Sequence, residues 1–160
     1  MLEQNNGKKP KKYAGILAHP TSFPSPYGIG DLGPGAYQFI DFLAASGLNL
    51  WQVLPLGHTG FGDSPYQPFS AFSAFAGQPL IIDIDYLRKK KLLLDEDFSA
   101  MPDWDPEKID YGTLIEFKTG LLKKAYERFI DADYADDMSG DEDLMAKFDA
   151  FVKNTSWLAD

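Results

Sequence analysis

Two short apolar runs that flank one amphipathic segment most constrain the fold of this chain. The runs are Tyr13–Ala18 and Asn49–Leu56, and the apolar residues of Ala36–Ser46 recur at helical spacing. Pro34 is well placed at the first position of that helix, and Gly47 suits its end. Continuous apolar strands are typical of a parallel sheet with both faces covered. These segments therefore predict one βαβ unit with two buried strands.

The second half of the chain is predicted to be mainly helical. A strong helix is predicted from about Asp110 to Ile130, and its apolar stripe is expected to pack into a core. Four basic residues are interpreted as lying off that stripe: Lys118, Lys123, Lys124 and Arg128. Weaker patterns indicate a short strand or a connector at 80–84, a short helix at 85–94, a loop at 95–109 and a last helix at about 143–152.

Two or three strands are too few to complete a parallel fold. A two-stranded parallel sheet cannot cover its own edges, whereas a barrel needs eight strands and about 250 residues. The chain has 160 residues, and a new amphipathic signal begins at 157–160, where it stops. We therefore expect the chain to be the N-terminal part of a larger α/β protein.

Composition argues against several classes of function. The formal net charge is −9, whereas general nucleic-acid binding needs a basic face. The chain has no cysteine and no run of 18 apolar residues, so neither a disulfide framework nor a membrane span is expected. Residues 1–12 hold four lysines and are not followed by the apolar h-region of a secretory signal, so we expect a disordered basic tail. A cytoplasmic protein is the simplest interpretation.

Two unusual loops, residues 19–33 and 57–79, follow the two predicted strands. Ligand sites in parallel α/β folds lie beyond the carboxyl ends of strands, so we expect both loops on one face and close together. The second loop is too long and too aromatic for a plain connector. Its aromatic faces suit the apolar faces of sugar rings. For Tyr66, which lies between Pro65 and Gln67, a sugar-binding role and a structural role are equally open on these grounds.

These loops hold three further candidates for chemistry, and each has a structural alternative. Asp31 and Asp63 could form a carboxylate pair for glycosyl chemistry, or they could close turns. His19 and His58 suit hydrogen bonding better than metal ligation, because no placed carboxylate or cysteine accompanies them. Gly28–Gly33 matches G-x-G-x-x-G, but roughly ten residues separate it from the strand, whereas a dinucleotide fingerprint lies in the tight first turn. We therefore expect these glycines to shape a loop.

Three long blocks resemble the N-terminal region of one enzyme family. They are Gly15–Gly33 (GILAHPTSFPSPYGIGDLG), Leu50–Gln67 (LWQVLPLGHTGFGDSPYQ) and Phe72–Asp83 (FSAFAGQPLIID). The family is that of amylomaltase, the 4-alpha-glucanotransferase or disproportionating enzyme of starch, glycogen and maltodextrin metabolism. The resemblance implies an α/β fold: the N-terminal part of a (β/α)8 TIM barrel, with its first βαβ unit followed by a mainly helical insertion. Residues 13–85 would then start the catalytic barrel with its substrate-binding loops, and residues 86–160 would be a helical insertion subdomain, truncated at its C-terminal end.

The resemblance also implies a reaction. The family transfers an α-1,4-glucan segment, with retention, to the 4-hydroxyl of an acceptor glucan or glucose, and it uses no metal or organic cofactor. Its Asp nucleophile, its Glu acid and base and its second Asp all lie well downstream of the region that matches this chain. No residue here is therefore expected to be catalytic, Asp31 and Asp63 included, and the remainder of the barrel is required. A non-catalytic glucan-binding module is the alternative, and a dinucleotide-binding unit is less favoured.

Substrate-binding residues carry over from one motif in the second loop. Tyr66 resembles the family Tyr that lies against the sugar at the cleavage site, and Ser64 matches its polar neighbour. Asp63 and Gln67 belong to the same motif. Phe61 stands where the family commonly has Tyr, so it keeps a stacking face but loses a hydroxyl. The segment SPYQPFSAFSAFAGQP departs from the family pattern by an apparent duplication of SAF, which lengthens the loop by three residues.

Overall fold

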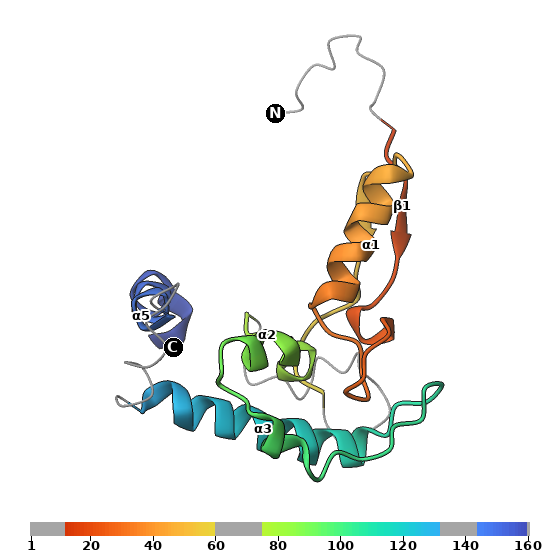
Figure 1. The fold of residues 1–160 in the computed structure, drawn as a ribbon. Coiled ribbons are helices and arrows are strands. Elements are labelled where there is room, and N and C mark those ends of the chain that lie inside the picture. The colour runs from red at the N-terminus through yellow and green to blue at the C-terminus, as the bar shows by residue number, and fades with distance from the viewer. Residues whose placement is uncertain (1–11, 60–74, 132–143, 160) are drawn as a thin grey trace.

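The computed structural model describes residues 12–59, 75–131 and 144–159 (Figure 1). The helices and strands are β1 (Gly15–Leu17), α1 (Pro34–Ala45), β2 (Leu50–Gln52), α2 (Ile84–Lys89), α3 (Tyr111–Ile130) and α5 (Leu144–Asn154). Short 3₁₀ turns lie at Pro20–Ser22, Pro79–Ile81, Asp95–Phe98 and Ser156–Ala159. Figure 1 shows β1, α1 and β2 extending together from a layer that α2 and α3 form.

The predicted βαβ unit is confirmed. β1 and β2 pair in parallel, with Ile16 opposite Trp51. The Phe39 ring of α1 lies 5.4 Å from the Trp51 ring and 5.2 Å from the Phe23 ring of the first loop, measured between centroids. The Trp51 indole N–H also donates to the Ala18 carbonyl at 2.7 Å, which fastens the end of β1 to β2. Helix and sheet are thus held together by an aromatic cluster that includes the following loop.

Both ends of α1 follow the signals in the sequence. Pro34 is its first residue, where a missing N–H costs no intrahelical bond. Ser46 caps the last turn, and Gly47 follows with φ of +69°, the left-handed conformation that favours glycine after a helix. These features confirm the predicted boundaries of this helix.

The prediction that both strands are buried is wrong for the described residues. Each strand has three residues instead of the six to eight expected, and the side chains of Leu17 and Leu50 are 54% and 50% exposed. The physical reason is that α1 packs on one face of the sheet only: it contacts Trp51, and Leu17 and Leu50 belong to the opposite face because successive side chains alternate along a strand.

Helix α3 organises the core of the second half. The Asp110 carboxylate accepts bonds from the backbone N–H of Gly112 at 3.1 Å and of Thr113 at 3.3 Å, which satisfies two free donors at the helix start. The predicted apolar stripe is confirmed as core packing. One cluster comprises Tyr27, Ile84, Leu92, Leu93, Leu121 and Ala125, and a second comprises Ile29, Leu80, Tyr111 and Leu114. The first loop, through Tyr27 and Ile29, therefore packs into the same core as α3.

The interpretation that Lys118 lies off the apolar stripe is wrong. Its side chain is fully buried, with an exposed fraction of 0%. The spacing explains this: Lys118 follows Leu114 by four residues and precedes Leu121 by three, so all three lie on one face of α3. Arg128 is also half-buried, and its guanidinium bonds to Asp97.

The remaining predictions are confirmed in outline, with shifted boundaries. At residues 80–84 the connector, rather than the strand, is correct, since Pro79–Ile81 is a 3₁₀ turn. Helix α2 is shorter than expected and ends at Lys89, before Lys91 takes up a φ of +56°. The predicted loop at 95–109 contains one short 3₁₀ turn. Helix α5 lies where a last helix was predicted, and Phe148 packs edge-to-face on Phe129 of α3 at 5.5 Å.

Within the described ranges, no helix combines the length and the apolar character needed to cross a membrane.

Candidate functional site

The first loop begins with a buried histidine. His19 lies two residues after the end of β1 and is 4% exposed. Its Nδ1 lies 2.7 Å from the Thr21 hydroxyl. Burial lowers the pKa of His19, and a hydrogen bond with the Pro55 backbone partly opposes that shift. The imidazole therefore joins the segments that follow β1 and β2, which agrees with the hydrogen-bonding role expected for it.

Asp31 closes a turn at the start of α1. Its Oδ1 accepts the backbone N–H of Gly33 at 2.9 Å, the short-range pattern of an Asx turn. Burial raises the pKa of Asp31, while the Gly33 bond and the nearby charge of Lys118 oppose the shift. Of the two alternatives for this residue, the turn is the one found in the structure.

The glycines of Gly28–Gly33 shape this loop rather than a nucleotide site. The connection between β1 and α1 runs from residue 18 to residue 33, so the motif does not form a tight turn after the strand. Gly28 has φ of +78°, and a Cβ there would lie 2.5 Å from the Trp104 ring. At Gly30 a Cβ would lie 2.2 Å from the Pro20 carbonyl oxygen. The expectation that these glycines are structural is confirmed.

Gln78 ties together the two sides of the second loop at its base. The side-chain amide of Gln78 donates to the Gly57 carbonyl at 3.2 Å and to the Thr59 hydroxyl. Gln78 and Thr59 are buried, at 5% and 3% exposed. Residues 57–59 and residue 78 thus meet, and the intervening segment leaves from and returns to one place.

The two loops meet at this base, as expected. The Leu32 N–H donates to the Ile81 carbonyl at 3.0 Å. From α3, the Lys118 ammonium donates to the Leu80 carbonyl at 2.7 Å and to the Ile82 carbonyl at 3.4 Å. Burial lowers the pKa of Lys118 to about 8, against the attraction of Asp31 and Asp83. The carboxyl ends of both strands therefore lead to one bonded platform.

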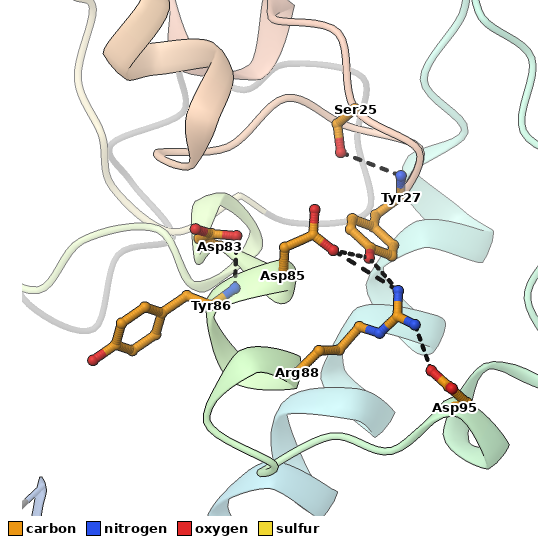
Figure 2. Close-up of polar contacts among 7 residues, drawn as sticks. All are labelled: Ser25, Tyr27, Asp83, Asp85, Tyr86, Arg88 and Asp95. Atoms are coloured by element: carbon orange, nitrogen blue, oxygen red, sulfur yellow. Dashed lines mark hydrogen bonds and ion pairs between the residues drawn. The ribbon is translucent and has the colours of Figure 1, made fainter. Parts of the chain in front are cut away.

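Tyr27 fastens the first loop to α2 (Figure 2). Its hydroxyl donates to Asp85 Oδ1 at 2.5 Å and accepts from Arg88 Nη1 at 3.2 Å. Arg88 also pairs with the exposed Asp95. Burial raises the pKa of Tyr27, and the bond to Asp85 adds to the shift. Figure 2 shows the phenol, the carboxylate and the guanidinium converging beside α2, with the Tyr27 N–H turned toward Ser25 Oγ at 3.2 Å.

A cleft of about 680 Å³ opens between the first loop and residues 101–109. The Trp104 ring stands in its lining, packs on Gly28 and meets Phe117 edge-to-face at 5.7 Å. Phe23 of the first loop also lines the cleft. The sequence predicts only a loop at 95–109. The signal for this wall of the cleft is an isolated tryptophan between Asp103 and Asp105.

The predicted substrate-binding residues lie outside the described residues. Structural description stops at Thr59 and resumes at Phe75, so the positions of the five remain predictions: Phe61, Asp63, Ser64, Tyr66 and Gln67. The sequence analysis did not predict the supporting contacts of three residues, namely Tyr27, Gln78 and Lys118. No group of three or more His, Cys, Asp or Glu side chains able to hold a metal occurs in residues 12–59, 75–131 and 144–159.

Comparison with known proteins relates this chain to one family. A sequence profile described as 4-alpha-glucanotransferase matches residues 18–160. The 4-alpha-glucanotransferase of Synechocystis sp. is 40% identical over 149 residues, which cover 89% of this chain and 29% of that protein. That of Clostridium butyricum is 44% identical over 143 residues, covering 89% of this chain and 27% of the relative.

A solved structure agrees with the sequence comparison. An amylomaltase from Streptococcus agalactiae, in complex with acarbose, matches with a TM-score of 0.73 and 36% identity. The match covers 92% of this chain and 28% of that one. The chain thus spans between a quarter and a third of the length of these relatives. Because the family profile covers nearly all of its residues, the chain belongs to the 4-alpha-glucanotransferase family.

Proposed function

We propose that this chain supplies the N-terminal, glucan-binding part of a 4-alpha-glucanotransferase. The observation that carries the proposal is the family match over residues 18–160. The bonded platform of residues 78–82 supports it, because it brings together the two loops that follow β1 and β2. The solved relative is in complex with acarbose. The proposed substrates are α-1,4-glucans such as maltooligosaccharides.

Within this function, Tyr66 is proposed to lie against the sugar at the cleavage site. Ser64, Asp63 and Gln67 would supply hydrogen bonds around it, and Phe61 would offer an apolar face without a hydroxyl. A flat aromatic face suits the C–H face of a glucose unit, and polar neighbours suit its hydroxyl rim. Gln78 supports this proposal, because it holds both ends of the loop that contains these residues.

The proposed reaction takes its catalytic carboxylates from outside residues 1–160. Asp31, the buried acid of the first loop, is engaged in a turn through its bond to Gly33. A retaining transfer needs two carboxyl groups about 5–5.5 Å apart, one as nucleophile and one as acid and base. We therefore propose that the chain alone is inactive, and that the downstream carboxylates of the barrel complete the site. The reaction is proposed to need no metal or organic cofactor.

The finer architecture belongs to the same proposal. Residues 13–85 would form the start of a (β/α)8 barrel, and residues 86–160 a helical insertion subdomain. The parallel pairing of β1 and β2 around α1 supports the first part. Cytoplasmic location is a further proposal. Two plant relatives differ, because they carry "chloroplastic/amyloplastic" in their names. Fractionation of the source cells would test it.

A chimera tests the function directly. In the Synechocystis enzyme, the matched 149 residues would be replaced by this chain. We expect the chimera to convert maltotriose into glucose and longer maltooligosaccharides, and the 160-residue chain alone to do neither. In the chimera, Tyr66→Ala is expected to raise KM by about tenfold through lost stacking, while Tyr66→Phe keeps KM within about threefold.

Two outcomes would contradict the proposal. Turnover of maltotriose by the chain alone would show that a catalytic pair lies within it. A folded chimera without transfer activity would show that the chain does not supply the missing part. Titration of the chain with maltoheptaose, followed by tryptophan fluorescence, addresses the alternative: tight saturable binding would favour a free-standing glucan-binding module.

A further inference from the structure

Lys118 is a fully buried cation that the proposed reaction does not use. Its side chain is 0% exposed, on the same face of α3 as Leu114 and Leu121. A buried ammonium is costly unless its donors are satisfied. Two backbone carbonyls meet this need, those of Leu80 at 2.7 Å and Ile82 at 3.4 Å. The side chain therefore ends on the main chain of another segment and not on an acid.

The backbone carbonyls of residues 80–82 accept hydrogen bonds from two other parts of the molecule. Leu80 and Ile82 face Lys118 of α3, and the carbonyl between them, that of Ile81, accepts the Leu32 N–H of the first loop at 3.0 Å. Each of these three consecutive carbonyls is thus bonded to a segment other than its own. They lie two to four residues after Gln78, so they fix where the second loop ends relative to where the first one ends.

Two carboxylates stabilise the charge of Lys118 from the same platform. Asp31, in the turn before α1, and Asp83, at the cap of α2, both attract the ammonium. Their attraction opposes the cost of burial, and the pKa of Lys118 stays near 8, so the group is mostly charged at neutral pH. A well-packed apolar residue in place of a buried ion is often no less stable. The charge of Lys118 is therefore better explained by the geometry that it sets than by a gain in stability.

We propose that Lys118 is a positioning residue for glucan binding: it fixes the base of the loop at 57–79 against the loop at 19–33. The inference rests on the proposed function, because its consequence is the relative position of the two loops that are proposed to bind glucan. Lys118 itself does not touch the sugar. Without the ammonium, the carbonyls of Leu80 and Ile82 lose their partner on α3, and the base of the second loop is free to shift.

Kinetics in the chimera test this role against a matched control. Lys118→Met keeps the length of the side chain and removes its donors. We expect KM for maltotriose to rise about tenfold, with kcat within about threefold, because misplaced binding groups weaken binding. Leu121→Ala removes a buried side chain one turn along the same helix, and its KM is expected within about twofold of the parent. Both variants are assayed where circular dichroism reports a folded protein. An unchanged KM in Lys118→Met, or an equal rise in Leu121→Ala, would overturn the proposal.

A second measurement does not depend on activity. In the full 160-residue chain, amide hydrogen exchange at Leu32 reports directly on its bond to Ile81. We expect Lys118→Met to speed exchange at Leu32 about tenfold relative to the amides in the middle of α1, and Leu121→Ala to leave that ratio unchanged. Equal ratios in both variants would overturn the role of Lys118. If the unaltered chimera transfers no glucan, the proposed function fails, whereas this exchange ratio still decides whether Lys118 holds the platform.

Discussion

Replacing Asp97 by asparagine is expected to lower the free energy of unfolding by about 3 kcal/mol, because breaking a buried ion pair leaves the partner charge without compensation. Asp97 is 7% exposed. Its carboxylate accepts from Arg128 Nη1 at 2.5 Å and Nη2 at 3.1 Å, and from the Leu94 N–H at 2.8 Å. Lys124 lies 3.2 Å from it. Urea unfolding of the chain and of Asp97→Asn measures the difference.

An exposed pair provides the control for that experiment. Arg88 and Asp95 also form an ion pair, but their side chains are 40% and 90% exposed. Asp95→Asn is therefore expected to cost no more than about 1 kcal/mol. A cycle of Asp97→Asn, Arg128→Met and the double variant isolates the buried pair from other losses. Equal costs at Asp97 and Asp95 would contradict the claim that the buried pair holds α3 to the 3₁₀ turn.

The pH dependence of this effect has a definite sign. The bonds from Arg128 hold the pKa of Asp97 well below its ordinary value. The stabilisation is thus present above the ordinary aspartate pKa of about 4, and it is lost as the pH falls through the lower pKa of the folded state. The gap in stability between the unaltered chain and Asp97→Asn should therefore be constant near neutral pH and shrink in acid.

Local signals in the sequence predicted the helices best. Pro34 and Gly47 mark the ends of α1, and Asp110 marks the start of α3 as a side-chain cap. Each acts within about four residues along the chain, so its partner is visible in the sequence. The same spacing logic would have placed Lys118 on the buried face of α3. Only the charge of a lysine argues against that position, because buried lysines are rare.

The platform of the candidate site could be predicted only in its general place. That two loops meet follows from parallel strands, whose carboxyl ends share one edge. The groups that join them are main-chain carbonyls of residues 80–82 and side chains of Gln78 and Lys118. Every residue has a main-chain carbonyl, so a bond to one leaves no mark in the sequence. Lys118 is also 36 to 38 residues from the carbonyls it bonds. Such long-range contacts depend on tertiary packing, which neither periodicity nor motif spacing specifies.

Gly28→Ala is expected to destabilise the chain by about 2–4 kcal/mol, combining left-handed backbone strain with overpacking. Gly28 has φ of +78°, and its added Cβ would lie 2.5 Å from the Trp104 ring, in the lining of the cleft. The ring cannot withdraw freely, since its other contacts include Phe117 of α3. Urea unfolding measures the loss, and tryptophan fluorescence reports whether the indole moves.

Gly47 separates the two causes. Its φ of +69° is nearly the same, but nothing lies within 4 Å of a Cβ added there. Gly47→Ala therefore carries backbone strain alone and should cost about 1–2 kcal/mol. The extra loss of stability in Gly28→Ala measures how tightly Trp104 packs on the first loop. Trp104→Leu in the Gly28→Ala background should recover part of that loss, because the smaller side chain makes room. If the two glycine variants lose equal stability, the indole is not held against Gly28, and the wall of the cleft is looser than its contacts indicate.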